Sequence, residues 1–502
     1  MISAHPKVDF PIPFIVSLRL LLAVLAAAAP LCAGGEGPRP EGAAPDAVES
    51  RLCLRRVVAG DPGAGMALVE RMAHYRVPGV AIAVIDGGRI DWVRGYGVSR
   101  AGTESPVGPD TPFQVASISK PVTAAAVLSL VGDGRLDLQM PLDRWLPGWP
   151  GPDNRFATDQ PVTLARLLSH TAGVGGHSYV GYPRGADLPT TADILAGRAP
   201  ANSPPVTLDT LPGALWRYSS GGYVAVQAVI ETVTGRPFAD VVRERVLAPL
   251  DMHHSFFTVA DSAVVAGGHR DTGNPVPGGW HVYPEQAAAG LWSSAADLAH
   301  FGIALMRAAA GDSAGEAATF VPMLTPLTAG WGPGMAMGGE GASLRLWHSG
   351  ANVGYRALLV VFPHLGRGAV ILCNGDGGGP LITEIVRAIA SVYDWPHYRP
   401  EVLHPLALGR AELAAYVGRY RLKSGLNVTV QPDGAGVRVR VNRQAPRRMV
   451  PVAADTFVGL DCDTRLRFRR EQGAVTGLVI VQGRFQVPAE RLPESTAATT
   501  AP

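Results

Sequence analysis

The sequence predicts two folded domains, a larger α+β domain followed by a small all-β domain. Runs rich in β-branched residues occur at 77–97 and again at 344–373, and between them most apolar residues recur at helical spacing. Strands at both ends of a helical region are expected to share one antiparallel sheet, with the helices gathered beside it. After residue 411 apolar and polar residues alternate, which is typical of antiparallel strands.

Length and composition indicate a globular protein with a large apolar core. The chain has 502 residues, of which 47% are hydrophobic and 17% charged, and a chain of this length is expected to form more than one domain. The formal net charge is only +2, so the charge balance gives no argument for nucleic acid as a partner.

The first 33 residues are expected to be a signal peptide. Lys7 and Arg19 precede an apolar run, residues 20–29, that has the length of a signal-peptide core and is too short to span a bilayer. This pattern predicts an exported protein, periplasmic or secreted, with an uncleaved membrane anchor as the alternative. Residues 34–64 are rich in Gly, Pro and Ala and predict a linker that leads into a short helix.

The α+β domain is expected to occupy residues 65–397. Two β-rich runs within 77–97 flank Asp86-Gly87-Gly88, a turn that tolerates positive φ, so this segment predicts a β-hairpin. Apolar spacing predicts the other elements, which are helices over 121–132, 162–169, 222–235, 237–247 and 295–308 and strands over 344–348, 355–362 and 367–373.

The all-β domain is expected at 411–494, after a Pro-containing linker at 398–410 and before a disordered tail at 495–502. Its short alternating runs, separated by turn residues, predict a small barrel or sandwich. The alternation is clearest where valines and arginines take turns, at Val437, Arg438, Val439, Arg440 and Val441.

The second domain is basic, since residues 411–495 contain 14 Lys and Arg against 8 Asp and Glu. The simpler interpretation is that the arginines solvate the outside of the domain. The alternative is a basic face that associates with anionic surfaces of the cell envelope.

Lysine is rare in this chain, and the position of one lysine is informative. Only Lys7, Lys120 and Lys423 occur, and Lys120 follows Ser117 by three residues. Residues three apart lie on the same face of a helix, so this spacing brings an amine next to a hydroxyl. Unlike arginine, lysine can lose its proton near neutral pH when its surroundings disfavour the ammonium, and an activated serine nucleophile requires such a removable proton. A Ser-x-x-Lys match alone is weak evidence, and the scarcity of lysine strengthens it.

Two further segments carry polar side chains that could act with this pair. Tyr218 and Ser220 can present two hydroxyls from one loop before a helix, and Tyr218 could act as a base if nearby cations lowered its pKa. His348-Ser349-Gly350-Ala351 ends a β run, where a strand edge can hydrogen-bond an extended substrate and glycine permits close approach. Taken singly, a buried structural tyrosine and a structural histidine are the better interpretations.

Together the three segments resemble the penicillin-recognising serine hydrolases, which include class C β-lactamases, D,D-peptidases, D-aminopeptidases and related carboxylesterases. The pattern of that superfamily is Ser-x-x-Lys, Tyr-x-Asn and Lys/His-x-Gly, in this order. Segments between the motifs are similar too, at 163–173, 247–252 and 289–297. The resemblance covers about 70–390 and implies a β-lactamase-like antiparallel sheet with a helical subdomain. The second domain resembles, more loosely, the lipocalin-like barrel attached to some of these hydrolases.

The resemblance implies a role for each matched residue. Ser117 is the expected nucleophile, which forms an acyl-enzyme, and Lys120 is expected to help activate it. Tyr218 is expected to move protons to the leaving group and from the deacylating water. Which of Lys120 and Tyr218 is the general base is left open.

The resemblance also assigns the binding groups. The backbone N–H groups of Ser117 and Ala351 are expected to form the oxyanion hole. His170 is expected to be structural and to hold a loop. Substrate binding is expected from Ser220, His348, Ser349 and Gly350.

Two positions depart from the superfamily pattern. Ser220 replaces the usual Asn, which removes an amide that could bind a substrate carbonyl and Lys120. His348 replaces the Lys of class C β-lactamases, and histidine is mostly neutral near pH 7, so a permanent charge for a β-lactam carboxylate is lost. Both changes favour an esterase or a peptidase over an efficient β-lactamase.

The leading hypothesis is an exported serine hydrolase that acts on a small ester, amide or peptide. A D,D-carboxypeptidase or D-aminopeptidase for cell-wall peptides is the second, and a non-catalytic ligand-binding or sensor protein on the same fold is the third. No cofactor or metal is expected, because Cys53, Cys373 and Cys462 have no metal-ligand spacing. Buried or free thiols are the preferred interpretation of these cysteines, with a disulfide from Cys53 as the alternative.

Overall fold

The computed structural model describes residues 43–61, 65–149, 155–156, 160–176, 178–259, 264–312, 314, 317–483 and 485–493. The predicted signal peptide at 1–33 and the predicted tail at 495–502 lie outside these residues. Within the described part, no helix combines the length and the apolar character needed to cross a membrane.

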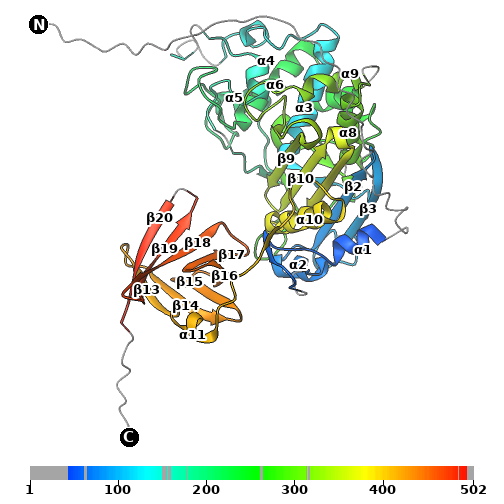
Figure 1. The fold of residues 1–502 in the computed structure, drawn as a ribbon. Coiled ribbons are helices and arrows are strands. Elements are labelled where there is room, and N and C mark those ends of the chain that lie inside the picture. Colours follow the sequence, from blue (N-terminus) through cyan, green and yellow to red (C-terminus); the bar gives the residue numbers. More distant parts are fainter. Residues whose placement is uncertain are drawn as a thin grey trace, which may run out of the picture. The chain divides into compact units, whose positions relative to one another are not determined.

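The larger domain is built on a six-stranded sheet with the order β3-β2-β11-β10-β9-β8 (Figure 1). All neighbouring strands in this order are antiparallel. Strands from both ends of the domain sequence share the sheet, so the predicted α+β fold is confirmed. The strands are β2 (Gly79–Asp86), β3 (Arg89–Gly97), β8 (Ala336–Gly338), β9 (Arg345–Asn352), β10 (Tyr355–Phe362) and β11 (Arg367–Cys373).

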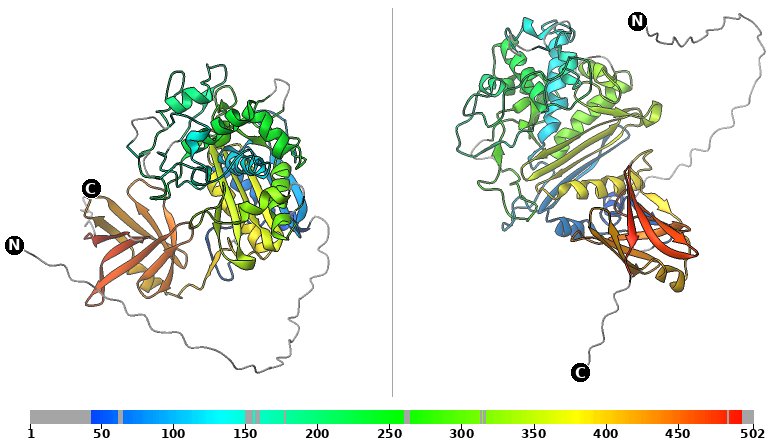
Figure 2. Two further views of the ribbon diagram at one scale, coloured as in Figure 1. Left: turned by 90° about the horizontal axis from the view of Figure 1, so that it is seen from above. Right: turned by 90° about the vertical axis from the view of Figure 1, so that its left-hand side faces the viewer.

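Helices cover both faces of this sheet (Figure 2). Val80, Ile82 and Val84 of β2 belong to one apolar cluster, together with side chains of α1, α2 and α10. The intervening Ala81 and Ala83 belong to a second cluster, which contains α3, α6 and α8. Because both faces are buried, residues 80–85 of β2 are all apolar and show no alternation.

The five predicted helices are confirmed, with shifted ends. The helix expected at 237–247 is α7 followed by a π-helical turn, Arg243–Leu247. The helices are α1 (Ala43–Glu49), α2 (Leu68–Tyr75), α3 (Ser119–Gly132), α4 (Leu164–Leu168), α5 (Thr191–Ala196), α6 (Ser220–Thr234), α7 (Phe238–Val242), α8 (Ala295–Ala309), α9 (Ala317–Phe320), α10 (Gly378–Val392) and α11 (Arg410–Ala414).

Two segments predicted to be linkers contain regular structure. Within 34–64, helix α1 buries Val48 in the cluster that also contains α10. Strand β1 (Arg56–Val58) of the same segment pairs in parallel with β12 (Glu401–Leu403), which lies within 398–410. Their partners lie far away in the sequence, so neither composition nor periodicity revealed these elements. Short antiparallel pairs also join β4 (Phe113–Gln114) to β7 (Trp292–Ser293) and β5 (Tyr182–Pro183) to β6 (His281–Val282).

The second domain is a closed eight-stranded barrel, which decides between the predicted barrel and sandwich. The alternation of its sequence is real, since Val437 and Val439 are buried while Arg438 and Arg440 are exposed. The strands are β13 (Gly418–Leu422), β14 (Asn427–Asp433), β15 (Gly436–Val441), β16 (Arg447–Ala453), β17 (Thr456–Gly459), β18 (Thr464–Glu471), β19 (Ala474–Gln482) and β20 (Phe485–Arg491).

The three described cysteines are free thiols. Cys53 and Cys373 are buried and Cys462 is partly exposed. This agrees with the preferred interpretation of the sequence, and the alternative disulfide from Cys53 is not formed.

Candidate active site

Ser117 lies on a tight turn at the start of α3. A single 3-10 turn runs directly into the helix, so Ser117 is placed where the first N–H groups of a helix lack intrahelical partners. The preceding Ala116 has a φ of 49°, a left-handed conformation that costs free energy for a residue with a Cβ. The Val115 N–H donates to the Leu291 carbonyl at 3.0 Å, and the Leu291 N–H donates to Ser119 Oγ at 3.0 Å. These bonds hold the strained turn.

Strand β9 passes close to this turn, and Gly350 makes the approach possible. A Cβ at Gly350 would lie 2.1 Å from the Val115 carbonyl oxygen. Strand β8 pairs with only the first three residues of β9, while β10 pairs along its other edge. In the described structure, the stretch His348–Asn352 therefore has a free edge on the β8 side.

Lys120 is the buried amine of the site. Its Nζ donates to Ser117 Oγ at 2.9 Å and to the Ala288 carbonyl at 2.8 Å, and its side chain is fully buried. Burial lowers the pKa of Lys120 to about 7, so a large share of the amine is neutral near neutral pH. Pro121 is compatible with this geometry because α3 begins at Ser119, which places Pro121 in the first turn.

Tyr218 comes from the loop before α6 and reaches the same point. Its hydroxyl hydrogen-bonds with Ser117 and Ser220, and its ring centroid lies 5.0 Å from Lys120 Nζ. Burial raises the pKa of Tyr218 to about 12, so the phenol keeps its proton near neutral pH. The condition for Tyr218 to act as a base, a lowered pKa, is not met, and this favours Lys120 as the base.

Ser219 and His170 fix the Tyr218 loop. Ser219 caps α6, since its Oγ accepts a hydrogen bond from the Gly222 N–H at 3.2 Å. The Ser219 N–H donates to His170 Nδ1 at 3.2 Å, and the His170 ring packs on Tyr218 with centroids 4.3 Å apart. Burial lowers the pKa of His170, which keeps the ring neutral. This is the structural role that the sequence predicted.

His348 is also buried and neutral. Its Nδ1 donates to the Ser349 carbonyl at 2.7 Å, which requires the proton on Nδ1. Burial, and next the nearby Lys120 charge, lower the pKa of His348 to about 3. The indole of Trp331 packs beside this ring, with centroids 5.7 Å apart.

These side chains open onto one cavity of about 400 Å³. All the predicted site residues line this cavity except Lys120 and Gly350. Lys120 is buried behind Ser117, and Gly350 packs against the turn at 115–118 that carries Ser117. The lining residues are Ser117, Ser178, Tyr179, Tyr218, Ser220, Ala289, Trp331, Ala336, Trp347, His348, Ser349, Ala351 and Asn352.

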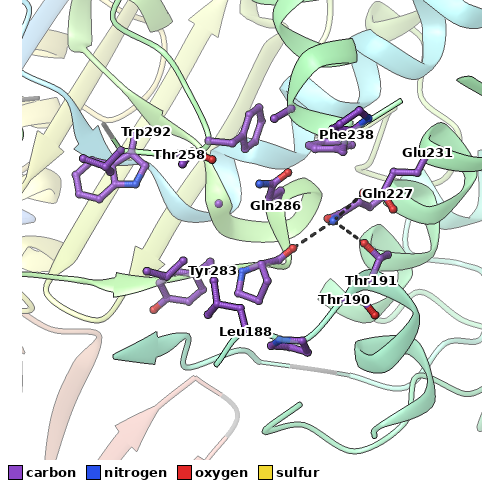
Figure 3. A pocket seen from close by; sticks show the side chains of 18 of the residues that line it. Leu188, Thr190, Thr191, Gln227, Glu231, Phe238, Thr258, Tyr283, Gln286 and Trp292 are labelled. Carbon is purple, nitrogen blue, oxygen red and sulfur yellow. Dashed lines mark hydrogen bonds between the residues drawn. The ribbon is translucent and has the colours of Figure 1, made fainter. Parts of the chain in front are cut away.

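A second cavity, of about 1040 Å³, shares one wall element with the first. The π-helical turn Gln286–Gly290 contributes Gln286 and Gly290 to the larger cavity and Ala289 to the cavity at Ser117. Gln227 of α6 holds this turn, because its Oε1 accepts from the Ala287 N–H at 3.0 Å. Its Nε2 donates to Thr191 Oγ1 at 3.0 Å and to the Pro284 carbonyl at 3.2 Å (Figure 3).

Gln227 therefore positions the carbonyl that holds Lys120. Ala287 precedes Ala288, whose carbonyl accepts from Lys120 Nζ. Neither Gln227 nor the Ala288 carbonyl was found from the sequence, and neither was Trp331. A glutamine within the apolar run 223–230, and a tryptophan between the glycines of Gly330-Trp331-Gly332, were the available signals.

Among the described residues, no group of three or more His, Cys, Asp or Glu side chains is arranged to hold a metal ion. The site itself brings a hydroxyl, an amine and a phenol together at Ser117. This is the arrangement expected of the penicillin-recognising serine hydrolase superfamily, and the comparisons with known proteins support that superfamily.

The chain belongs to the beta-lactamase family, whose model matches residues 67–394. Penicillin-binding protein 4 of Amycolatopsis lactamdurans is 30% identical over 377 residues, which are 70% of this chain and 95% of that protein. Esterase EstB of Burkholderia gladioli is 35% identical over 217 residues, 41% of this chain and 54% of that protein.

Solved structures agree with the fold. The octameric penicillin-binding protein homologue from Pyrococcus abyssi matches with a TM-score of 0.59 at 23% identity, over 84% of this chain and 98% of that one. SurE matches with a TM-score of 0.53 at 25% identity, over 85% of this chain and 97% of that one.

The pH dependence of acylation tests the role of Lys120. If neutral Lys120 takes the Ser117 proton, the rate of serine labelling should rise with pH through about 7 and level off above it, because the neutral fraction of the amine rises in that range. In the Lys120→Arg variant the guanidinium cannot give up its proton, so the rate of serine labelling should fall about 10³-fold. A rate independent of pH between 5 and 9 contradicts the assignment.

That experiment needs a control that separates the titration of Glu285 from that of Lys120, because burial raises the pKa of Glu285 to about 7 as well. Its side chain is fully buried. The Glu285→Gln variant should keep the rise through pH 7 if Lys120 causes it. Loss of the rise in this variant would assign the titration to Glu285.

Gly350→Ala tests the contact between β9 and the nucleophile turn. The added Cβ meets the Val115 carbonyl, so either the turn or the strand must move. We expect the free energy of unfolding to fall by about 1–3 kcal/mol, measured by denaturant titration, and Ser117 labelling to slow more than the stability loss explains. Gly132→Ala near the end of α3 is the matched control, because its Cβ meets nothing within 4 Å. Normal labelling of Gly350→Ala would show that the close approach is not needed.

Gln227→Leu tests the support of the π-helical turn. Loss of the acceptor leaves the Ala287 N–H buried without its partner and loosens the carbonyl that holds Lys120. We expect kcat to fall about tenfold with a smaller change in KM. Thr191→Val removes the Thr191 contacts to Gln227 Nε2 and to Glu231 but keeps the bond from the Ala287 N–H to Gln227 Oε1, so it should change kcat by less than about twofold. Equal effects of the two variants would place the role of Gln227 in general stability.

Proposed function

We propose that this protein is an exported serine hydrolase that cleaves an ester or amide bond through an acyl-enzyme on Ser117. The observation that carries the proposal is the 2.9 Å contact between Lys120 Nζ and Ser117 Oγ, with the pKa of that amine lowered to about 7. A neutral amine at hydrogen-bond distance is what a serine needs in order to lose its proton as it attacks.

Acylation begins when neutral Lys120 takes the proton of Ser117 as Oγ attacks the substrate carbonyl carbon. The carbonyl oxygen gains the negative charge, and the N–H groups of Ser117 and Ala351 are proposed to stabilise it. Tyr218, protonated and bonded to Ser117, gives a proton to the leaving group as the carbon–leaving-group bond breaks, and the proton on Lys120 replaces it. In deacylation a water molecule attacks the acyl carbon, its proton returns by the same route, and Ser117 is released.

The lining of the cavity favours an ester over a substrate with a terminal carboxylate. Among the described residues that line it, none is Asp, Glu, Lys or Arg. His348, at the position where class C β-lactamases have Lys, is neutral, and Lys120 is occupied by Ser117 and Ala288. A carboxylate would therefore enter the cavity without a described cation to pair with, which is costly. Similarity to Esterase EstB supports this preference.

A D-amino-acid peptidase is the second candidate, and the relatives favour it. The chain is similar to Penicillin-binding protein 4 of Amycolatopsis lactamdurans and, at 25% identity, to SurE, which has been solved with D-Leu. Neutral peptide bonds could pair with the free edge of β9. A non-catalytic sensor on the same fold is less well supported, because the three reactive groups are present and in contact. Export, and association of the basic barrel with the cell envelope, remain predictions.

Labelling with a fluorophosphonate, followed by mass mapping, tests the proposal. We expect the label on Ser117, and Ser117→Ala should lose labelling and at least about 10³-fold of its activity. Ser129→Ala, at the other end of α3, is the matched control and should label normally. Wild-type labelling of Ser117→Ala would refute the nucleophile.

Substrate panels then separate the two candidate activities. Short-chain 4-nitrophenyl esters should be turned over faster than peptides that end in D-alanine, because the described lining offers no cation for the terminal carboxylate. The reverse order would make the peptidase the better description.

A further inference from the structure

Two side chains that line the cavity at Ser117 each carry a buried ring nitrogen with no hydrogen-bond partner among the described residues. The two nitrogens are His348 Nε2 and Trp331 Nε1. Both side chains line the cavity that Ser117 opens onto, and their ring centroids are 5.7 Å apart. Buried polar groups are nearly always paired, so this couple points to a ligand.

The two nitrogens have opposite hydrogen-bonding character. His348 Nδ1 donates to the Ser349 carbonyl, so the neutral ring leaves a lone pair on Nε2, which can only accept. The indole Nε1 of Trp331 can only donate. A group that pairs with both must therefore donate one hydrogen bond and accept another.

The surroundings exclude a charged partner. The described lining residues contain no Asp, Glu, Lys or Arg, and the rings of Tyr218 and Trp331, which both line the cavity, pack beside His348. A carboxylate would face the lone pair of His348 and lose its hydration without compensation. A neutral carboxamide or hydroxyl would satisfy both nitrogens.

We propose that Trp331 and His348 form a subsite for a neutral carboxamide or hydroxyl group on the substrate, and that this subsite discriminates against carboxylates. The proposal rests on the proposed serine hydrolase function and names its substrate class. A water molecule has the same donor and acceptor chemistry, so the experiment must distinguish a substrate group from a resident water.

Three matched 4-nitrophenyl esters test the subsite. Their acyl groups derive from adipic acid with its second carboxylate free, from adipic acid monoamide and from heptanoic acid. The glutaric and pimelic homologues of the first two esters vary the chain length. We expect the best carboxamide ester to exceed the apolar ester in kcat/KM by about fivefold and the carboxylate ester by more than about tenfold. Rates that depend on chain length alone would overturn the proposal and leave a resident water as the partner.

Variants assign the effect to the two rings. Trp331→Phe keeps the aromatic face and removes the N–H, so the ratio of carboxamide to apolar ester should fall towards one. His348→Lys supplies a cation and should raise the relative rate of the carboxylate ester. Trp149→Phe is the matched control, because its indole N–H is already bonded to the Val206 carbonyl at 3.0 Å, and it should leave both ratios unchanged. Unchanged ratios in Trp331→Phe and His348→Lys would overturn the assignment.

A binding measurement keeps the subsite testable if turnover is absent. Calorimetric titration of the Ser117→Ala protein with adipamide and with adipate should show tighter binding of the diamide, and Trp331→Phe in that background should weaken it. Turnover without discrimination would remove the subsite and keep the hydrolase. Discrimination in binding without Ser117 labelling would remove the hydrolase and keep the subsite.

Discussion

The proposed chemistry of this protein depends on the burial of one amine. Lys120 is fully enclosed, and its bonding partners are the Ser117 hydroxyl and the Ala288 carbonyl, neither of which is charged. Desolvation therefore acts on the ammonium without a counter-ion to oppose it, and the pKa falls to about 7. A partner carboxylate would have restored the usual lysine pKa and left a permanently charged, unreactive group.

Keeping the amine in this state requires support from several distant elements. The nucleophile turn carries a left-handed alanine, Ala116, and is held by bonds to Leu291 and by close packing against Gly350. The π-helical turn that supplies the Ala288 carbonyl is fixed by Gln227 on α6. The same helix begins at Ser220, directly after the loop that carries Tyr218. The strained conformation of Ala116, next to Ser117, is thus held by residues of the sheet and of segments remote in the sequence.

The other titratable groups around the cleft are uncharged, as the lysine is when it has lost its proton. Burial raises the pKa of Tyr218 and lowers the pKa values of His170 and His348, so each of these groups is uncharged near pH 7. A cavity whose groups are all neutral stabilises a charge mainly where backbone N–H groups point. Under the proposed mechanism, selectivity for the transition state lies with the backbone N–H groups of Ser117 and Ala351, and the proposed Trp331–His348 subsite selects the substrate through hydrogen bonds.

The sequence alone determined those features that depend on residues close together in the chain. The spacing of Ser117 and Lys120 on one helical turn, the hairpin at 77–97 and the alternating valines and arginines of the barrel follow from local periodicity, and the structure contains all three. An ordered set of motifs, interpreted as a resemblance, added Tyr218 and His348 and the correct family. Tertiary structure alone decided the pKa of Lys120, the hold of Gln227 on Ala287, the position of Trp331 and the pairing of β1 with β12. Each of these depends on atoms brought together from remote parts of the chain, and burial and long-range pairing leave no periodic signal in the sequence.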